Sequence, residues 1–85
     1  MATYRIELKK SAQKNLAQLP KDVQHRIGEA INALANDPRP DSCKKLQGYE
    51  DTYRIRIGDY RVIYEVHDGL LLIYVLRIAD RKDVY

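Results

Sequence analysis

The chain has 85 residues, 45% of them hydrophobic, which suits one domain with a single core. Its 15 Lys and Arg exceed its 12 Asp and Glu, and the resulting net charge of +3 is only a weak indication of nucleic-acid binding. A lone cysteine, Cys43, excludes a disulfide within the chain. Neither a secretory signal nor an apolar run of membrane-spanning length is present, so we expect a cytoplasmic protein without a membrane partner.

The first half of the chain predicts one strand and two helices. Residues 4–8 alternate between apolar and polar, as in a strand. Ser11 is expected to cap a short helix that ends before Pro20. A second helix is predicted from an apolar stripe at helical spacing, formed by Val23, Ile27, Ala30, Ile31 and Leu34. Because about two residues join the helices, they should form an antiparallel hairpin.

The second half changes to the period of two that is typical of strands. Two turn dipeptides, Gly58-Asp59 and Asp68-Gly69, separate three predicted strands over residues 53–57, 60–66 and 70–77, and a brief strand fits residues 44–46. The order β-α-α-β-β-β predicts an α+β fold with a single domain over residues 1–85. In this fold the helical hairpin packs on one face of a mainly antiparallel sheet, and the other face stays open.

Basic residues alternate with the core residues of these strands. Arg54 and Arg56 point to the same side of their strand, and Arg61 is expected beside Arg56 on the open face. Because folding requires only the apolar half of this pattern, the arginines indicate an anion site. A solvated sheet face with cross-strand ion pairs to Glu65 or Glu7 is the alternative.

Other chemistries have less support in the sequence. No glycine-rich phosphate loop is present, and Cys43 has no second cysteine with which to bind zinc. The two histidines, His25 and His67, lie on separate predicted elements. We therefore expect neither a cofactor nor a metal.

Arginines suit an RNA phosphodiester in particular. Their guanidinium groups are always charged and match phosphate oxygens with paired donors. RNA also carries its own nucleophile, the 2′-hydroxyl, so that only two proton transfers remain for the protein. Tyrosine and arginine have high ordinary pKa values, of about 10 and above 12, but positive charge lowers the pKa of a nearby tyrosine.

Two segments resemble a known family. Residues 53–66 (YRIRIGDYRVIYEV) and 76–85 (LRIADRKDVY) are similar to the RelE-type toxins of bacterial toxin–antitoxin modules, and the likeness extends over essentially the whole chain. This resemblance implies a ribosome-dependent endoribonuclease that enters the A site, cleaves the mRNA and leaves a 2′,3′-cyclic phosphate. It further implies a cognate antitoxin as protein partner, with operator DNA contacted only through the antitoxin complex.

The resemblance also assigns roles to individual residues. Arg54 and Arg56 match two basic strand positions that are lysines in the best-known members, and Arg61 matches the arginine that contacts the scissile phosphate. Arg81 and Tyr85 match the remaining active-site positions. Because arginine cannot share a proton as lysine can, proton transfer would fall to Tyr85. Auxiliary contacts to ribosomal RNA are expected from Lys44, Lys45, Arg77 and Lys82.

Two other functions remain open on the same scaffold. ParE-type toxins inhibit DNA gyrase and cut no RNA, and a catalytically silent member would act only as an antitoxin-binding or repressor partner. The basic set together with Tyr85 favours RNA cleavage, because a gyrase inhibitor has no chemical need for it.

Overall fold

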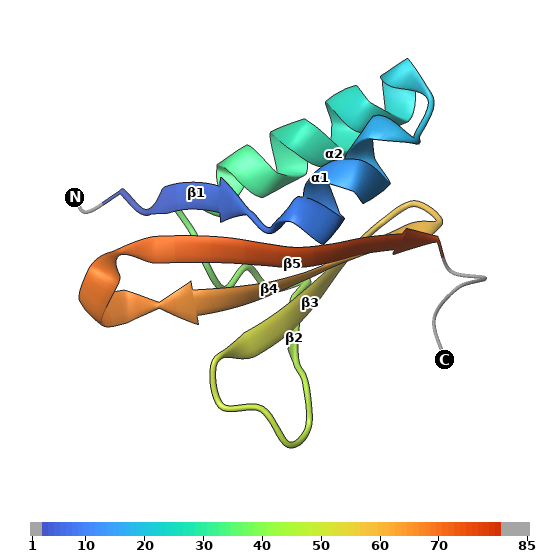
Figure 1. Ribbon diagram of the computed structural model, residues 1–85. Coiled ribbons are helices and arrows are strands. Elements are labelled where there is room, and N and C mark those ends of the chain that lie inside the picture. The colour runs from blue at the N-terminus through green and yellow to red at the C-terminus, as the bar shows by residue number, and fades with distance from the viewer. Residues whose placement is uncertain (1–2, 81–85) are drawn as a thin grey trace.

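Two helices lie on one side of a five-stranded sheet (Figure 1). The computed structural model describes residues 3–80. Its elements are β1 (Arg5–Leu8), α1 (Lys10–Ala17), α2 (Lys21–Ala33), β2 (Lys44–Lys45), β3 (Thr52–Ile57), β4 (Tyr60–His67), the 3₁₀ turn η1 (Asp68–Leu70) and β5 (Leu72–Asp80). Within residues 3–80, neither helix is long and apolar enough to cross a membrane.

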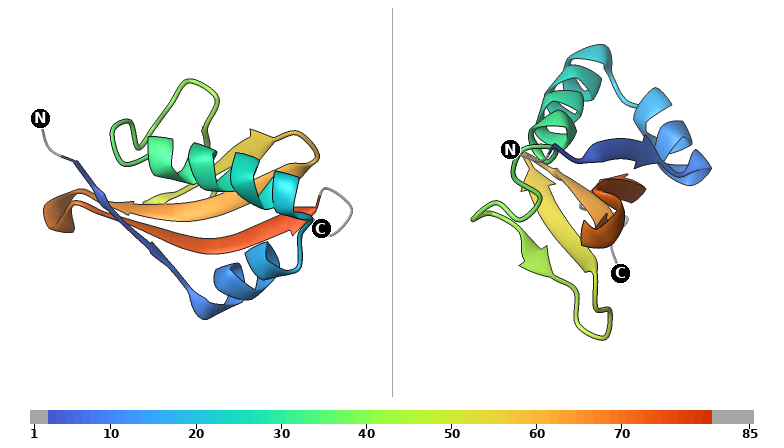
Figure 2. Two further views of the ribbon diagram at one scale, coloured as in Figure 1. Left: turned by 90° about the horizontal axis from the view of Figure 1, so that it is seen from above. Right: turned by 90° about the vertical axis from the view of Figure 1, so that its left-hand side faces the viewer.

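The strands follow the order β1-β5-β4-β3-β2. β1 runs parallel to β5, whereas all other neighbours are antiparallel. The predicted α+β fold with a mainly antiparallel sheet is therefore confirmed. β5 lies between β1 and β4, which explains why its sequence is apolar on both faces. The two views in Figure 2 show α1 and α2 along the same side of the strands.

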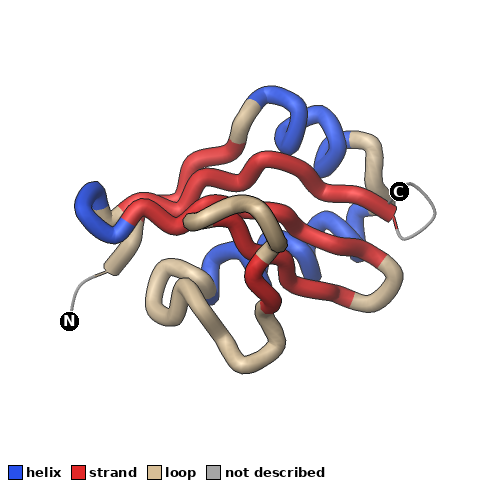
Figure 3. Tube along the Cα trace, turned by 90° about the horizontal axis from the view of Figure 1, so that it is seen from below, coloured by secondary structure: helices blue, strands red, loops and turns tan. Residues whose placement is uncertain are grey.

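The core fills the space between the helices and the sheet. Three residues of the predicted helical stripe, Ile27, Ile31 and Leu34, are fully buried there. The sheet contributes the side chains that alternate toward the helices, namely Ile55, Val62, Tyr64, Val66, Ile73, Val75 and Ile78. The opposite alternation sends the polar residues to the face without helices, which is seen from below in Figure 3.

Helix α1 covers the part of β5 that β1 does not reach. β1 ends at Leu8, opposite Val75. Beyond that point the Ser11 hydroxyl donates to the Leu76 carbonyl over 2.9 Å, and the Asn15 side-chain oxygen accepts from the Ile78 N–H over 3.1 Å. The prediction of Ser11 as helix cap was wrong, because α1 begins at Lys10 with Lys9 as its cap, and Ser11 lies inside the helix and binds β5.

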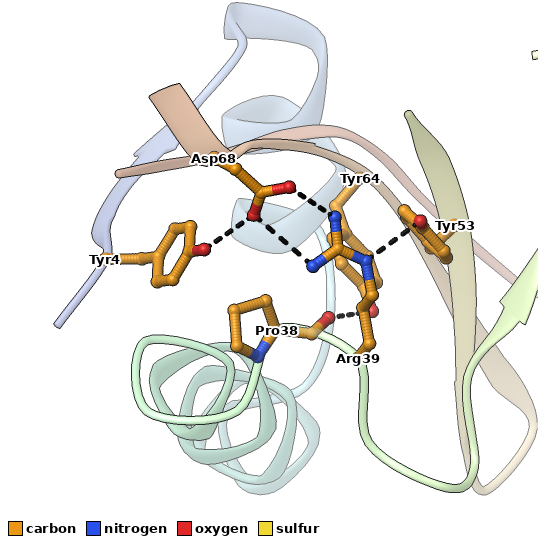
Figure 4. Close-up of polar contacts among 6 residues, drawn as sticks. All are labelled: Tyr4, Pro38, Arg39, Tyr53, Tyr64 and Asp68. Carbon is orange, nitrogen blue, oxygen red and sulfur yellow. Dashed lines mark hydrogen bonds and ion pairs between the residues drawn. The ribbon is translucent and has the colours of Figure 1, made fainter. Parts of the chain in front are cut away.

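A polar network holds the loop after α2 against β3 and against the turn that follows β4 (Figure 4). Arg39 donates two hydrogen bonds to Asp68, the shorter over 2.8 Å, and a third to the Tyr53 hydroxyl over 2.9 Å. The Tyr4 hydroxyl donates to the same carboxylate over 2.6 Å. Hydrogen bonds from Arg39 and Tyr4 lower the pKa of the Asp68 carboxyl group. Burial raises the pKa of the Tyr64 hydroxyl group.

Candidate functional site

The open face of the sheet carries two adjacent rows of basic residues. In one row Arg54 of β3 lies between Lys44 of β2 and Ile63 of β4, and Ile63 lies opposite Arg77 of β5. In the next row Arg56 lies opposite Arg61, which lies opposite Ala79. Residues directly opposite in antiparallel strands point to the same face, with their Cβ atoms roughly 4.5–5.5 Å apart. Five cations, Lys44, Arg54, Arg56, Arg61 and Arg77, therefore share one end of this face. We call them the basic face.

The three arginines at its centre have no acidic partner among residues 3–80. No ion pair within that range includes Arg54, Arg56 or Arg61. The Nε of Arg61 is buried and has no hydrogen-bond partner in the part of the chain that the structure describes. A buried donor without a partner costs about 1–3 kcal/mol. Because this Nε is closed off from solvent, an anion would bind Arg61 through the terminal nitrogens of its guanidinium group.

Acidic residues on the same face pair elsewhere. Glu65 contacts His67 over 2.9 Å, and Glu7 contacts Arg5 over 2.9 Å. The Glu7 pair lies within β1 and the Glu65 pair within β4. Both lie toward the end of the open face that is opposite the basic face. The cross-strand pairs from the arginines to Glu65 or Glu7, which were the alternative interpretation of the pattern, do not form. The charge on the open face is thus segregated, with cations at one end.

The other predicted site residues separate into three groups. Arg77 and Lys44 lie on the basic face, as expected for contacts that support it. Lys45 lies opposite Tyr53, whose ring stacks on Tyr64 in the core, so its register position belongs to the other face. Arg81, Lys82 and Tyr85 lie outside the described residues.

A hollow of about 420 Å³ lies beside the basic face. Its walls include Leu46 and Tyr49, from the loop between β2 and β3, and Ile63, Leu76 and Arg77 from the sheet. In Figure 1 this loop projects away from the helices, on the side of the open face. Sequence reasoning missed the hollow because strand periodicity says nothing about how a six-residue loop folds over a sheet.

The described side chains favour anions over metal ions as ligands. Among residues 3–80, no three His, Cys, Asp or Glu side chains come together as a metal-binding group. The cations of the basic face instead suit oxyanions, since guanidinium and ammonium groups are donors only. The basic face is therefore suited to bind phosphate groups and to stabilise added negative charge on them.

Comparison with known proteins identifies the family of this chain. Residues 6–85 match the family described as the ParE toxin of the type II toxin-antitoxin system, parDE. The chain is 36% identical to the toxin RelE3 of Methanocaldococcus jannaschii over 78 residues, which cover 85% of this chain and 84% of that protein.

Solved structures give the same result. A chain of the archaeal RelE–RelB complex from Pyrococcus horikoshii has a TM-score of 0.84 at 37% identity, covering 96% of this chain and 99% of that one. The RelB–RelE complex from Methanococcus jannaschii gives a TM-score of 0.75 at 31% identity, with coverage of 92% and 93%. The chain therefore belongs to the RelE-type toxins of the RelE/ParE family of type II toxin–antitoxin systems.

Proposed function

We propose that this protein is a toxin that cleaves mRNA in the ribosomal A site. The observation that carries the proposal is the basic face, where Arg54, Arg56 and Arg61 lie together without an acidic partner among residues 3–80. RNA phosphates would provide the negative charge that these three arginines do not receive from residues 3–80. The open side of the sheet, which neither helix of the described residues covers, gives a phosphodiester backbone access to these arginines (Figure 3).

The proposed reaction uses the nucleophile that RNA contains. The 2′-oxygen attacks the adjacent phosphorus, an O2′–P bond forms and the P–O5′ bond breaks. One proton leaves the 2′-hydroxyl for a general base, and another reaches the departing 5′-oxygen from a general acid. The products are a 2′,3′-cyclic phosphate and a 5′-hydroxyl. The step balances without a covalent enzyme intermediate, and we propose that it is independent of a metal ion.

In this proposal the arginines stabilise the pentacoordinate phosphorus. Arg61 contacts the scissile phosphate through its guanidinium group, which forms no ion pair within residues 3–80. Arg54 and Arg56, which lie on the adjacent strand β3, bind the negative charge of the RNA next to the scissile phosphate. Preorganised donors of this kind act most strongly where charge develops in the transition state. Proton transfer is assigned to Tyr85, and Arg81 is assigned to the active site, because both match the family's active-site positions in the sequence.

Primer extension on a defined mRNA with purified ribosomes tests this proposal. We expect cuts within the A-site codon that require ribosomes, and a loss of about 100- to 1000-fold in the rate for Arg61→Ala. Arg5→Ala is the matched control, because Arg5 lies on the same face but pairs with Glu7. Absence of cutting by a folded, growth-inhibiting wild type would contradict the proposal.

Gyrase inhibition is the second candidate, because the matching family carries the name of the ParE toxin. A supercoiling assay with purified gyrase separates the two functions. Inhibition that persists in Arg61→Ala, without RNA cleavage by the wild type, would identify a gyrase inhibitor. A catalytically silent antitoxin-binding protein would show neither activity, and Arg61→Ala would leave its growth phenotype unchanged.

An antitoxin is the proposed protein partner. The related structures from Pyrococcus horikoshii and Methanococcus jannaschii are complexes with RelB. A cognate antitoxin would add a helix or strand to this protein and cover basic surface with acidic residues. Operator DNA would then be bound through the antitoxin in that complex. Co-expression with the neighbouring reading frame, followed by co-purification, tests whether such a partner exists.

A further inference from the structure

The hollow beside the basic face has an apolar wall and a polar wall. Leu46, Tyr49, Ile63 and Leu76 form the apolar part, and the polar part consists of Thr52, Glu65 and Arg77. Its volume of about 420 Å³ falls within the roughly 300–1,000 Å³ that is common for sites that take small molecules. Tyr49 remains 63% exposed at its edge, so its ring is accessible to a ligand.

A break in strand register forms this wall. Ile63 lies opposite Arg77, whereas the next residue of β4, Tyr64, lies opposite Val75, so Leu76 is an extra residue in β5. Such a bulge redirects a side chain, because two residues of one strand then oppose a single residue of its partner. Leu76 and Arg77 consequently line the same hollow, although consecutive residues of a regular strand point to opposite faces.

The hollow is continuous with the basic face. Ile63, in its apolar wall, lies in the row that also contains Lys44, Arg54 and Arg77. A ligand that fills the hollow therefore has cations next to it on both sides of Ile63. An apolar hollow that borders this row of cations, with Glu65 and Arg77 in its polar wall, is complementary to a flat aromatic base whose anionic backbone lies over the cations.

We infer that this hollow accepts one unstacked base of the mRNA and that Tyr49 stacks on it. The inference rests on the proposed function and extends it from the phosphate to a base. Stacking on an aromatic ring suits any base, because every base has a π-face. A protein segment would also meet apolar surface here, but the row of cations next to the hollow favours a ligand that carries its charge in the backbone beside each ring.

Glu65 adds the polar group that can distinguish between bases. It lines the hollow, and one of its carboxylate oxygens contacts His67 over 2.9 Å. An ionised carboxylate only accepts hydrogen bonds, so its other oxygen favours a base edge that presents N–H donors. Glu65 is thus a specificity-determining residue in this scheme, while Tyr49 provides affinity.

The test uses ribosomes programmed with mRNAs that vary the A-site codon. Tyr49→Ala is expected to lower the cleavage rate on the order of 10-fold, as for loss of one stacked base, and Tyr49→Phe to retain it. Leu70→Ala is the matched control, since Leu70 is 68% exposed and lies outside the hollow. Glu65→Gln should change the ranking of codons, because the amide adds a donor where the carboxylate had none.

A second readout reports stacking directly. A 2′-deoxy substitution at the cleavage site blocks the reaction, and 2-aminopurine is placed at each codon position in turn. We expect the wild type and Tyr49→Phe to quench fluorescence at one position and Tyr49→Ala to leave it unquenched. Thermal unfolding of each variant confirms that the protein is folded.

The outcomes separate this inference from the proposed function. If the wild type cleaves and Tyr49→Ala cleaves equally, with the same codon ranking, the base site is wrong and the nuclease stands. If Tyr49→Ala loses only affinity for an antitoxin, the hollow binds protein and the inference is also wrong. If the wild type neither cleaves nor quenches on ribosomes, the proposed function itself fails, and the base site fails with it.

Discussion

Arg56 of β3 and Arg61 of β4 lie directly opposite each other on the open face of the sheet. Like charges in such a pair destabilise a sheet, by an amount comparable to the roughly 0.2–1 kcal/mol that favourable pairs contribute. Arg56→Thr should therefore raise the free energy of unfolding in urea by about that amount, since threonine also suits a strand. The same variant should lose cleavage activity, because Arg56 belongs to the basic face.

Arg5→Thr is the matched control for this prediction. Arg5 lies on the same face but forms an ion pair with Glu7, at 2.9 Å. Its removal should leave cleavage unchanged and should not raise stability. If Arg56→Thr proved less stable than wild type, the two arginines would not repel each other in the folded protein. A gain in stability with a loss of activity is the pattern expected of a site kept for function.

The alternation of residues 53–64 was sufficient to predict the arginine rows. A strand fixes the face of each side chain by its period of two, and the short Gly58-Asp59 turn fixes the register with the next strand. The second helix followed equally from an apolar stripe. Ser11 was misassigned because its hydroxyl has a tertiary partner, the Leu76 carbonyl, that local sequence does not reveal. The hollow depends on a bulge and a loop, and neither has a periodic signal.

Two glycines should respond in opposite ways to alanine. Gly58, in the turn between β3 and β4, has φ of 61°, and a Cβ there would lie 3.1 Å from Nη2 of Arg26. Gly58→Ala should therefore lower the free energy of unfolding by about 1–2 kcal/mol, from the left-handed backbone. It should also reduce cleavage, since this turn sets the register of Arg56 with Arg61.

Gly28 in α2 is the counterpart of Gly58. A Cβ at Gly28 meets no atom within 4 Å. Gly28→Ala should stabilise the protein by about 0.5–1 kcal/mol, because alanine loses less backbone entropy in a helix. Cleavage should stay at the wild-type level, since α2 lies on the other side of the sheet. Urea unfolding of both variants measures the contrast, and equal effects of the two substitutions would show that backbone conformation does not determine them.

The contact of Asp68 with Arg39 predicts a pH dependence of stability. Hydrogen bonds from Arg39 and Tyr4 lower the folded-state pKa of Asp68 below its unfolded value of about 3.9. A lowered pKa means that the stabilisation is complete above pH 3.9 and disappears as the pH falls through the folded-state pKa. Asp68→Asn should thus be less stable than wild type at pH 7, and the difference should shrink at low pH.

Urea unfolding of both proteins between pH 7 and pH 2 measures this difference. Because the Asp68 and Arg39 side chains are partly exposed, 1 M salt should reduce it as well. Glu50→Gln serves as the control, since Glu50 is an exposed loop residue that forms no ion pair within residues 3–80. A difference that is constant over this pH range would show that charge on Asp68 contributes nothing.

Lys44 and Lys45 are neighbours in sequence that should differ in their contact with RNA. Lys44 lies opposite Arg54 on the basic face, and Lys45 lies opposite Tyr53 on the other. Each phosphate contact adds about 0.7–0.9 to the slope of log affinity against log salt. Lys44→Gln should reduce the salt slope of ribosome binding by about that amount, whereas Lys45→Gln should leave it unchanged. Fluorescence titrations from 50 to 300 mM KCl measure both slopes. Equal slopes for the two variants would mean that RNA reaches beyond the basic face to the edge strand as a whole.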